Sequence, residues 1–365
     1  MSRPVWKRLL KLAVATGLGL LAAAWTVGQL REREVARRDL QEVARITQKT
    51  TTVCIGRFLI DMPEETRLEL ARPRIDGFDI SSLDEPEADF QTRLAQREAR
   101  LRATPERLGG SRNVELVREV KTDNGVIGKI FVHGRTVREG TQLRGLVQER
   151  YRYEHVAVEA LVHGEGMSYE LSAEKYDPDQ IENLAKLVSK LIPNPAGTAP
   201  TEPGFCVNRA WFRAPLTADQ GEQIMMHAQL PSHPDIEFLV ILAAGNKPAL
   251  PSLLERSAQT EANLPLDVKN RVTRLRGAPR TIGGISGDEL VRRVVEKDDS
   301  VGYTFWWEVS GTEDNVHIPH FVFKMTTGEG NYAPVPSSLS QDGGMALWDK
   351  ISSSIRLHHP RPPGI

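Results

Sequence analysis

Hydrophobic and polar residues alternate along this chain in short runs that are typical of β-strands, and the runs form two groups. The first group predicts strands at 54–60, 67–71, 114–120, 126–133, 143–153, 156–162 and 167–171. The second group predicts strands at 205–212, 236–243, 270–275, 287–296, 303–309 and 319–325. Short connections favour antiparallel pairing, and the corner Asp123-Asn124-Gly125 indicates a tight hairpin because Asn and Gly tolerate positive φ.

Helical spacing of apolar residues predicts helices around these strands. In the first group one helix is predicted over 87–108, where Leu94, Leu101 and Leu108 lie seven residues apart, and another over 181–192. The second group has corresponding segments at 251–262 and 345–355. Ahead of the first strand, the segment 31–50 has a thin apolar face in a charged background, and we predict a tether helix there.

The two groups open with similar sequences. Thr52-Val53-Cys54-Ile55-Gly56-Arg57 begins the first, and Gly204-Phe205-Cys206-Val207-Asn208-Arg209 begins the second. The two cysteines are 152 residues apart, and the same spacing separates Tyr151-Arg152-Tyr153 from Tyr303-Thr304-Phe305. A period this long indicates two similar domains rather than a solenoid of short repeats. The predicted fold class is therefore α+β, with two similar lobes that are each a mainly antiparallel β-sheet covered by helices.

A proline-rich segment divides the two lobes. Four prolines fall within the eleven residues 193–203, which cannot continue a helix or a central strand. The predicted organisation is 1–30 as a signal peptide or membrane anchor, 31–50 as the tether helix, 51–192 as the N-terminal α+β domain, 193–203 as a linker, 204–357 as the C-terminal α+β domain and 358–365 as a tail.

The first 30 residues predict export from the cytoplasm. Four basic residues and no acid precede an uncharged stretch over 12–27, as in a signal peptide. Ala22-Ala23-Ala24 would suit cleavage, whereas the apolar length of 9–30 would suffice to cross a bilayer. Both alternatives stay open, and both predict a periplasmic body that is either soluble or anchored to the inner membrane.

Composition narrows the classes of partner. The 365 residues carry a formal net charge of -1, which gives no sign of a nucleic-acid-binding protein. After residue 24 the chain holds 43 basic and 48 acidic residues, so the body is mildly acidic. Apolar residues make up 40% of the chain, enough for a large core.

The sequence contains no strong catalytic signature. It has no Gly-x-Ser-x-Gly elbow, no His-Glu-x-x-His motif and no phosphate-binding loop. His317 and His320 are three residues apart, but further zinc ligands cannot be nominated, and Ser286 lies in a turn with no implied base. We therefore predict no catalytic, cofactor-binding or metal-binding residues, and no enzyme.

Two sets of residues are candidates for a structural or binding role. Cys54 and Cys206 are either a disulfide, as an oxidising periplasm would allow, or two buried thiols at equivalent strand starts. In Phe305-Trp306-Trp307 a strand would point Trp306 away from its neighbours. Trp306 and Trp307 are therefore a candidate partner interface, with core packing as the competing interpretation.

The opening motif resembles a known family. Cys54-Ile55-Gly56-Arg57-Phe58-Leu59-Ile60-Asp61-Met62-Pro63 after an export segment, with the later Gly204-Phe205-Cys206-Val207, is similar to the two-domain immunity proteins that neutralise type VI secretion phospholipase effectors. The resemblance covers about residues 50–357. It implies a periplasmic protein whose two lobes grip a cognate secreted phospholipase effector and keep its active site from membrane lipid. It assigns no catalytic residue, cofactor or contact residue.

A second function agrees with the same features. A non-catalytic envelope protein that binds another ligand or scaffolds an assembly would also need an export segment and two lobes. Its apolar N-terminal segment would then be retained as an anchor in the inner membrane. The residues alone do not separate this alternative from the immunity function.

Overall fold

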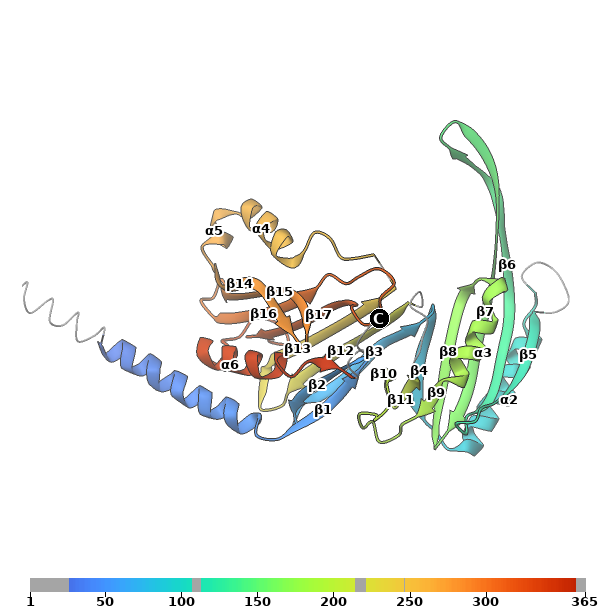
Figure 1. Cartoon of the computed structure of the whole chain (residues 1–365), viewed down its shortest axis with the longest axis horizontal. Helices are drawn as coiled ribbons and strands as arrows, with labels where there is room; N and C mark the ends of the chain where they lie inside the picture. Colours follow the sequence, from blue (N-terminus) through green and yellow to red (C-terminus); the bar gives the residue numbers. More distant parts are fainter. Residues whose placement is uncertain (1–25, 107–112, 214–220, 246, 359–365) are drawn as a thin grey trace, which may run out of the picture.

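A computed structural model of the chain describes residues 26–106, 113–213, 221–245 and 247–358 (Figure 1). The expected signal peptide or membrane anchor falls almost wholly outside these residues, as does most of the expected tail. Across the described ranges, no helix has the length and apolar character that crossing a bilayer requires.

A single sheet of twelve antiparallel strands forms the centre of the molecule. The first half of the chain supplies β3 (Arg67–Ile75), β4 (Phe78–Asp84), β5 (Val114–Lys121), β6 (Ile127–Arg144), β7 (Val147–Gly164) and β8 (Met167–Tyr176). The second half supplies β12 (Glu222–Leu230), β13 (His233–Ala244), β14 (Val272–Ile282), β15 (Ile285–Val295), β16 (Val301–Val309) and β17 (His320–Thr327). The prediction of antiparallel strands with helices is confirmed, but the expectation of a separate sheet in each lobe is wrong.

The strand order explains how the two sheets become one. It runs β14-β15-β16-β17-β13-β12-β3-β4-β8-β7-β6-β5, so each half repeats the other in reverse about the β12–β3 pair. These two strands are antiparallel neighbours, with His227 opposite Glu69. Each half alone would leave unpaired N–H and C=O groups along this edge, and pairing the two edges satisfies both. The halves are therefore related by an approximate two-fold axis between β3 and β12.

The two similar opening sequences are hairpins rather than the single strands predicted over 54–60 and 205–212. The first consists of β1 (Thr50–Ile55) and β2 (Phe58–Pro63), and the second of β10 (Gly204–Val207) and β11 (Ala210–Arg213). Each turn has only two residues, Gly56-Arg57 and Asn208-Arg209, between apolar runs, so each hairpin resembles one longer strand in the sequence. Gly56 and Arg209 have positive φ in the two turns, which lets the chain reverse there.

Each hairpin pairs with a short strand that closes a half of the chain. β10–β11 pairs with β9 (Leu191–Pro193), and β1–β2 pairs with β18 (Arg356–Leu357), the last strand of the second half. Equivalent backbone bonds follow: Asn194 N–H donates to Arg209 O at 2.9 Å and His358 N–H donates to Arg57 O at 2.8 Å. The start of the chain is thus built into its C-terminal half.

Helices lie on both faces of the sheet. They are α2 (Glu87–Ala103), the one-turn η1 (Pro178–Gln180), α3 (Glu182–Ser189), α4 (Leu253–Asn263), α5 (Leu266–Lys269) and α6 (Gln341–Ser352). The helix predicted over 87–108 therefore ends at Ala103, and those predicted over 181–192, 251–262 and 345–355 correspond to α3, α4 and α6. The last of these begins four residues earlier than expected, because Ser340 caps it.

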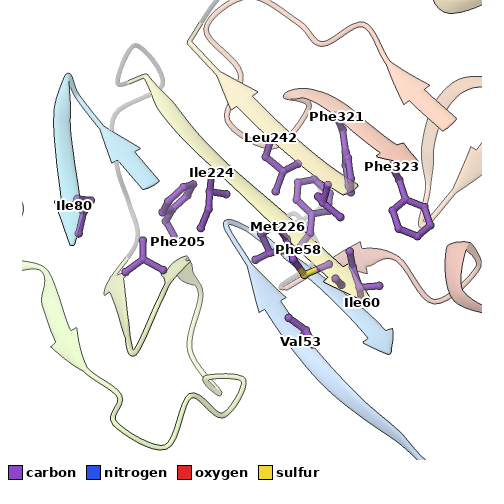
Figure 2. Close-up of a cluster of buried hydrophobic side chains, with 14 of the residues drawn as sticks. Val53, Phe58, Ile60, Ile80, Phe205, Ile224, Met226, Leu242, Phe321 and Phe323 are labelled. Atoms are coloured by element: carbon purple, nitrogen blue, oxygen red, sulfur yellow. The ribbon is translucent and has the colours of Figure 1, made fainter. Parts of the chain in front are cut away.

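The main core lies on one face of the sheet, between the strands and the layer formed by α3, α6 and the hairpins. Figure 2 shows Phe58 and Ile60 of the first hairpin beside Met226 and Leu242 of the central strands. Near α6, the Trp348 ring stacks on Phe323 with centroids 4.9 Å apart. The second hairpin places Phe205 in the same continuous core, so the hairpins join the packing of both halves.

The helix ahead of β1 covers residues 26–46, whereas the sequence predicted it within 31–50. Its final turns are packed against the body, because Val43 and Ile46 are buried. Asp39 is buried too, and its carboxylate accepts a hydrogen bond at 2.8 Å from the Ser340 N–H at the start of α6. An acidic group is favourable at a helix N-terminus. This contact fixes the helix on the C-terminal half.

The strands β6 and β7 extend well beyond their neighbours and form an arm (Figure 1). The sequence predicted a separate strand over 143–153, but this segment spans the arm's tip and part of β7. The equal spacing of Tyr151-Arg152-Tyr153 and Tyr303-Thr304-Phe305 indicated equivalent positions in the two halves, but the structure places the two motifs differently. Tyr303 is buried in the core, while the first motif lies in the arm, for which the described second half has no counterpart.

Candidate partner-binding site

A disulfide joins the two hairpins near the pseudo-symmetry axis. The sequence left two states open for Cys54 and Cys206, and the structure has the bonded one, with an S–S distance of 2.05 Å and Cα atoms 5.8 Å apart. Beside it, Gly56 and Cys206 exchange backbone hydrogen bonds of 3.0 and 2.7 Å. His358 lies close enough to form a metal-ligand set with the two sulfurs, but the disulfide leaves neither sulfur as a thiolate.

A buried ion pair holds the first hairpin on the central strand β12. Arg57 donates two hydrogen bonds to the Glu222 carboxylate, at 2.6 and 2.8 Å, and both side chains are buried. Burial raises the pKa of Glu222, while the hydrogen bonds and charge of Arg57 oppose this rise. The sequence drew attention to Arg57 as part of a motif, but gave no sign that Glu222 is its partner 165 residues away.

Similar arginine–glutamate pairs attach a helix to the sheet in each half. In the first half, Arg97 of α2 donates two bonds of 2.8 Å to Glu159 of β7. In the second half, Arg256 of α4 donates two bonds of 2.8 Å to Glu308 of β16. The hydrogen bond to Glu159 raises the pKa of Arg97 despite partial burial. The Arg97 pair uses two guanidinium nitrogens and the Arg256 pair uses one, and both fix where the helix lies on the sheet.

The strand registers place both pairs on the same face of the sheet. Directly opposite residues in antiparallel strands share a face. The pairing can be followed from strand to strand, starting at Glu159 of β7. The residues that lie opposite one another in turn are Ser172, Asp79, Arg74, Gln223, Ala243 and His320. The imidazole of His320 lies 3.3 Å from the Glu308 carboxylate. The helices α2 and α4 therefore lie on one face, at opposite ends of the row of strands.

Between α2 and α4 the strands at the seam, β12 and β3, expose side chains to solvent. Along β12, Ile224, Met226 and Ala228 are buried while His227 and Gln229 on the other face are exposed. This face includes a hollow of 430 Å³ across the seam between the halves, lined by Arg67, Leu68, Glu69, His227, Ala228, Gln229, Glu237 and Phe238. We call this stretch of β3, β12 and β13 the open face. It is a candidate partner-binding surface because it is wide, polar at the seam and flanked by helices.

The two candidate tryptophans lie on opposite faces of β16. Trp307 is fully buried, and its indole N–H donates to the Arg280 carbonyl at 3.0 Å, so a place in the partner interface is wrong for this residue. Trp306 lies on the same face as Glu308 and is half-buried, with the Lys324 ammonium 5.7 Å from its ring centroid. Trp306 alone stays a candidate contact, on the face of the sheet that carries α4.

The residues with possible chemistry do not form a catalytic constellation in the described part of the chain. Ser286 and His317 line a hollow of 620 Å³ with Arg356 and Leu357, but the hydroxyl of Ser286 lies 3.3 Å from that of Thr281. His320 interacts with Glu308 rather than with His317. The buried ion pairs instead stabilise the positions of the hairpin and the helices on the sheet.

Acid should weaken the α4 attachment, and this can be measured. Burial disfavours the charged form of Glu308, yet hydrogen bonds from His320 and Arg256 outweigh it and lower the pKa of Glu308 below 4.5. A lowered pKa contributes stability above the unfolded-state value that is lost as the pH falls through the folded-state value. We expect Glu308→Gln to make urea unfolding less sensitive to pH below about 4.5. The exposed Glu237→Gln is the matched control, and equal pH profiles for both variants would contradict this account.

Comparison with known proteins identifies the family. The chain belongs to the Tle cognate immunity protein 4 family: the model of its N-terminal domain matches residues 51–146, and that of its C-terminal domain matches residues 198–360. No curated protein matches the sequence.

Solved structures share the fold. An immunity protein TplEi of T6SS from Pseudomonas aeruginosa, complexed with an "L" peptide, is 23% identical, with a TM-score of 0.66 over 85% of this chain and 98% of that chain. Its apo structure is 24% identical, with a TM-score of 0.67 over 85% of this chain and 97% of that chain. A chain of a Tle4–Tli4 complex is 24% identical, with a TM-score of 0.67 over 86% of this chain and 98% of that chain.

Proposed function

We propose that this chain is a periplasmic immunity protein that binds a cognate type VI secretion lipase effector and keeps the effector's active site from lipid. The observation that carries the proposal is the match of both halves to the two domains of the Tle cognate immunity protein 4 family. A structure with the same fold was solved as a Tle4–Tli4 complex, which supports an effector as the partner. The described residues form no catalytic constellation that would favour an enzyme instead.

The architecture supports a binding function that depends on a preformed surface. The two halves share one sheet, and the disulfide and the Arg57–Glu222 pair hold the hairpins at their junction. Little conformational entropy would then be lost when a partner binds across both halves, which favours high affinity. The open face between α2 and α4 crosses this junction. It is therefore the surface on which we place the effector.

Two features support a periplasmic location. The sequence begins with a basic segment and then an uncharged apolar stretch, as export signals do. The Cys54–Cys206 disulfide suits an oxidising compartment. Retention of the apolar segment would add an inner-membrane anchor to the same function.

Co-expression tests the proposal directly. Candidate type VI secretion lipases from the same genome are each directed to the periplasm of a sensitive host, with or without this protein. We expect the full chain to restore growth and a variant without residues 1–30 to give no protection, because it stays on the wrong side of the membrane. Gel filtration of the purified proteins should show a complex. Equal killing with and without the full chain, together with no complex, would exclude the immunity function.

A further inference from the structure

The outer part of the β6–β7 arm has no packing partner within the described chain. Pairing with β5 ends at His133 and pairing with β8 ends at Val156, so 136–155 forms a two-stranded ribbon that pairs only with itself. Figure 1 shows this ribbon rising clear of the sheet. An isolated two-stranded ribbon is marginally stable in water. A partner that covered it would add the packing that it lacks.

The tip of the arm presents aliphatic side chains to solvent. Leu143 is 77% exposed, Leu146 is 102% exposed and Val147 is 62% exposed. Single exposed aliphatic residues are ordinary on protein surfaces, but three large ones gathered at a protruding tip mark an interaction site. We call Leu143, Leu146 and Val147 the aliphatic tip.

The two faces of the arm below the tip differ in chemistry. One face has ion pairs, in which Arg152 bonds Glu139 and Glu154. The other has Tyr151 and Tyr153, whose rings stack with centroids 5.2 Å apart. Tyr153 is half exposed, and such tyrosines are frequent in binding hot spots. The tyrosines alternate in phase with Glu159 along β7, so the aromatic side of the arm continues the face that carries α2 and the open face.

The charge of the arm also differs from that of the body. The ribbon 136–155 holds four arginines and three glutamates, so it is slightly basic, whereas the chain after residue 24 has 43 basic and 48 acidic residues. A basic projection with an aliphatic end complements an apolar cavity with an acidic rim. An enzyme that hydrolyses lipids must have an apolar cavity to hold the acyl chain.

We propose that the aliphatic tip inserts into the apolar acyl-binding cavity of the lipase effector while the tyrosine side of the arm lies along the cavity's rim. This inference rests on the proposed function and adds to it the element that blocks the active site. A lipid bilayer is a less suitable partner for the aliphatic tip. The helix over 26–46, which follows the apolar N-terminal segment, lies at the opposite end of the molecule from the arm (Figure 1). A membrane that held that segment would be far from the tip.

The test uses the full chain and the lipase against which it protects in the co-expression experiment. The tip variant is Leu143→Ser/Leu146→Ser/Val147→Ser. Its matched control is Leu250→Ser/Leu266→Ser, which removes leucines that are 76% and 73% exposed in the other half. All five side chains are exposed, so both variants should keep the wild-type melting temperature. Inhibition is measured with a soluble short-chain ester, because blocking the cavity acts on any acyl substrate whereas separation from a membrane does not.

We expect the wild-type chain and the control to inhibit hydrolysis of the soluble ester equally. The tip variant should need about 100-fold more protein for the same inhibition, as expected when three aliphatic anchors lose their pocket. If the tip variant inhibits like wild type, the proposal is overturned while the immunity function stands. If the wild-type chain forms no complex with the lipase, the proposed function itself fails.

Two further measurements separate the other possible occupants. Co-sedimentation with phosphatidylethanolamine–phosphatidylglycerol vesicles that the tip variant abolishes would assign the tip to a bilayer and overturn the proposal. Self-association in sedimentation velocity that the tip variant abolishes would assign it to a second copy of the chain, with the same consequence. We expect neither, because the tip should remain in solvent until the effector binds.

Discussion

Replacing Cys54 and Cys206 together by alanine is expected to lower the free energy of unfolding by about 4 kcal/mol. The bond closes a loop with a sequence separation of 152, and a crosslink across so long a loop removes much conformational entropy from the unfolded chain. It also joins the two hairpins beside the Gly56–Cys206 backbone bonds, where the halves meet. Urea unfolding of the oxidised protein and of the double variant measures the difference.

Reduction provides the control for this prediction. Dithiothreitol should lower the free energy of unfolding of the wild-type protein by a similar amount and should not change that of the double variant. Both forms should retain the same far-ultraviolet circular dichroism under native conditions, because the twelve-stranded sheet does not depend on the bond for its pairing. If oxidised wild type and double variant unfold at the same urea concentration, the disulfide does not stabilise the junction as described.

Arg57→Ala should lower the free energy of unfolding by about 3–5 kcal/mol, because it leaves the carboxylate of Glu222 buried without its partner. Both side chains are buried in the native protein, and water cannot replace the two hydrogen bonds that Arg57 donates. Loss of the arginine would also free the turn of the first hairpin from β12. Chemical denaturation at pH 7 measures the loss.

The pH dependence of this variant follows from the raised pKa of Glu222. An acid with a raised folded-state pKa destabilises the fold fully above that value, and this penalty shrinks as the pH falls from the folded-state pKa towards the lower unfolded-state pKa. The destabilisation by Arg57→Ala should therefore be smaller at pH 5 than at pH 8. Arg57→Leu/Glu222→Leu, which removes both charges, should recover most of the stability. If the double variant is as unstable as Arg57→Ala, the cost arises from lost packing rather than from the unpaired carboxylate.

Local sequence patterns were sufficient for the character of most elements. Alternation identified the strands, and the spacing of Leu94 and Leu101 identified α2, because half-buried strands and helices repeat with different periods. The corner Asp123-Asn124-Gly125 forms the turn between β5 and β6, as its residues indicated. The patterns failed at the two opening hairpins, where only two residues, Gly56-Arg57 or Asn208-Arg209, separate the apolar runs of the paired strands. They failed again at the arm, whose exposed valine and leucines resemble those of a buried strand.

The candidate site was mostly beyond the reach of the sequence. Trp306 and Trp307 are adjacent, and only the register of β16 against β17 shows that one faces α4 while the other fills the core. The Arg57–Glu222 pair joins residues far apart in the chain, which no local pattern can connect. For the arm there was one signal, because Gly145, between Arg144 and Leu146, favours a turn. That signal does not say that the flanking strands leave the sheet.

The sequence by itself determined the α+β class, the repeated halves, the absence of catalytic motifs and the resemblance to immunity proteins, because each depends on local pattern or on motif. Only the tertiary structure decided that the halves share one sheet, that each hairpin pairs with the closing strand of the opposite half and that an aliphatic tip projects into solvent. These features depend on which strand edges meet and which side chains remain uncovered. Both are set by contacts between residues that are distant in the chain.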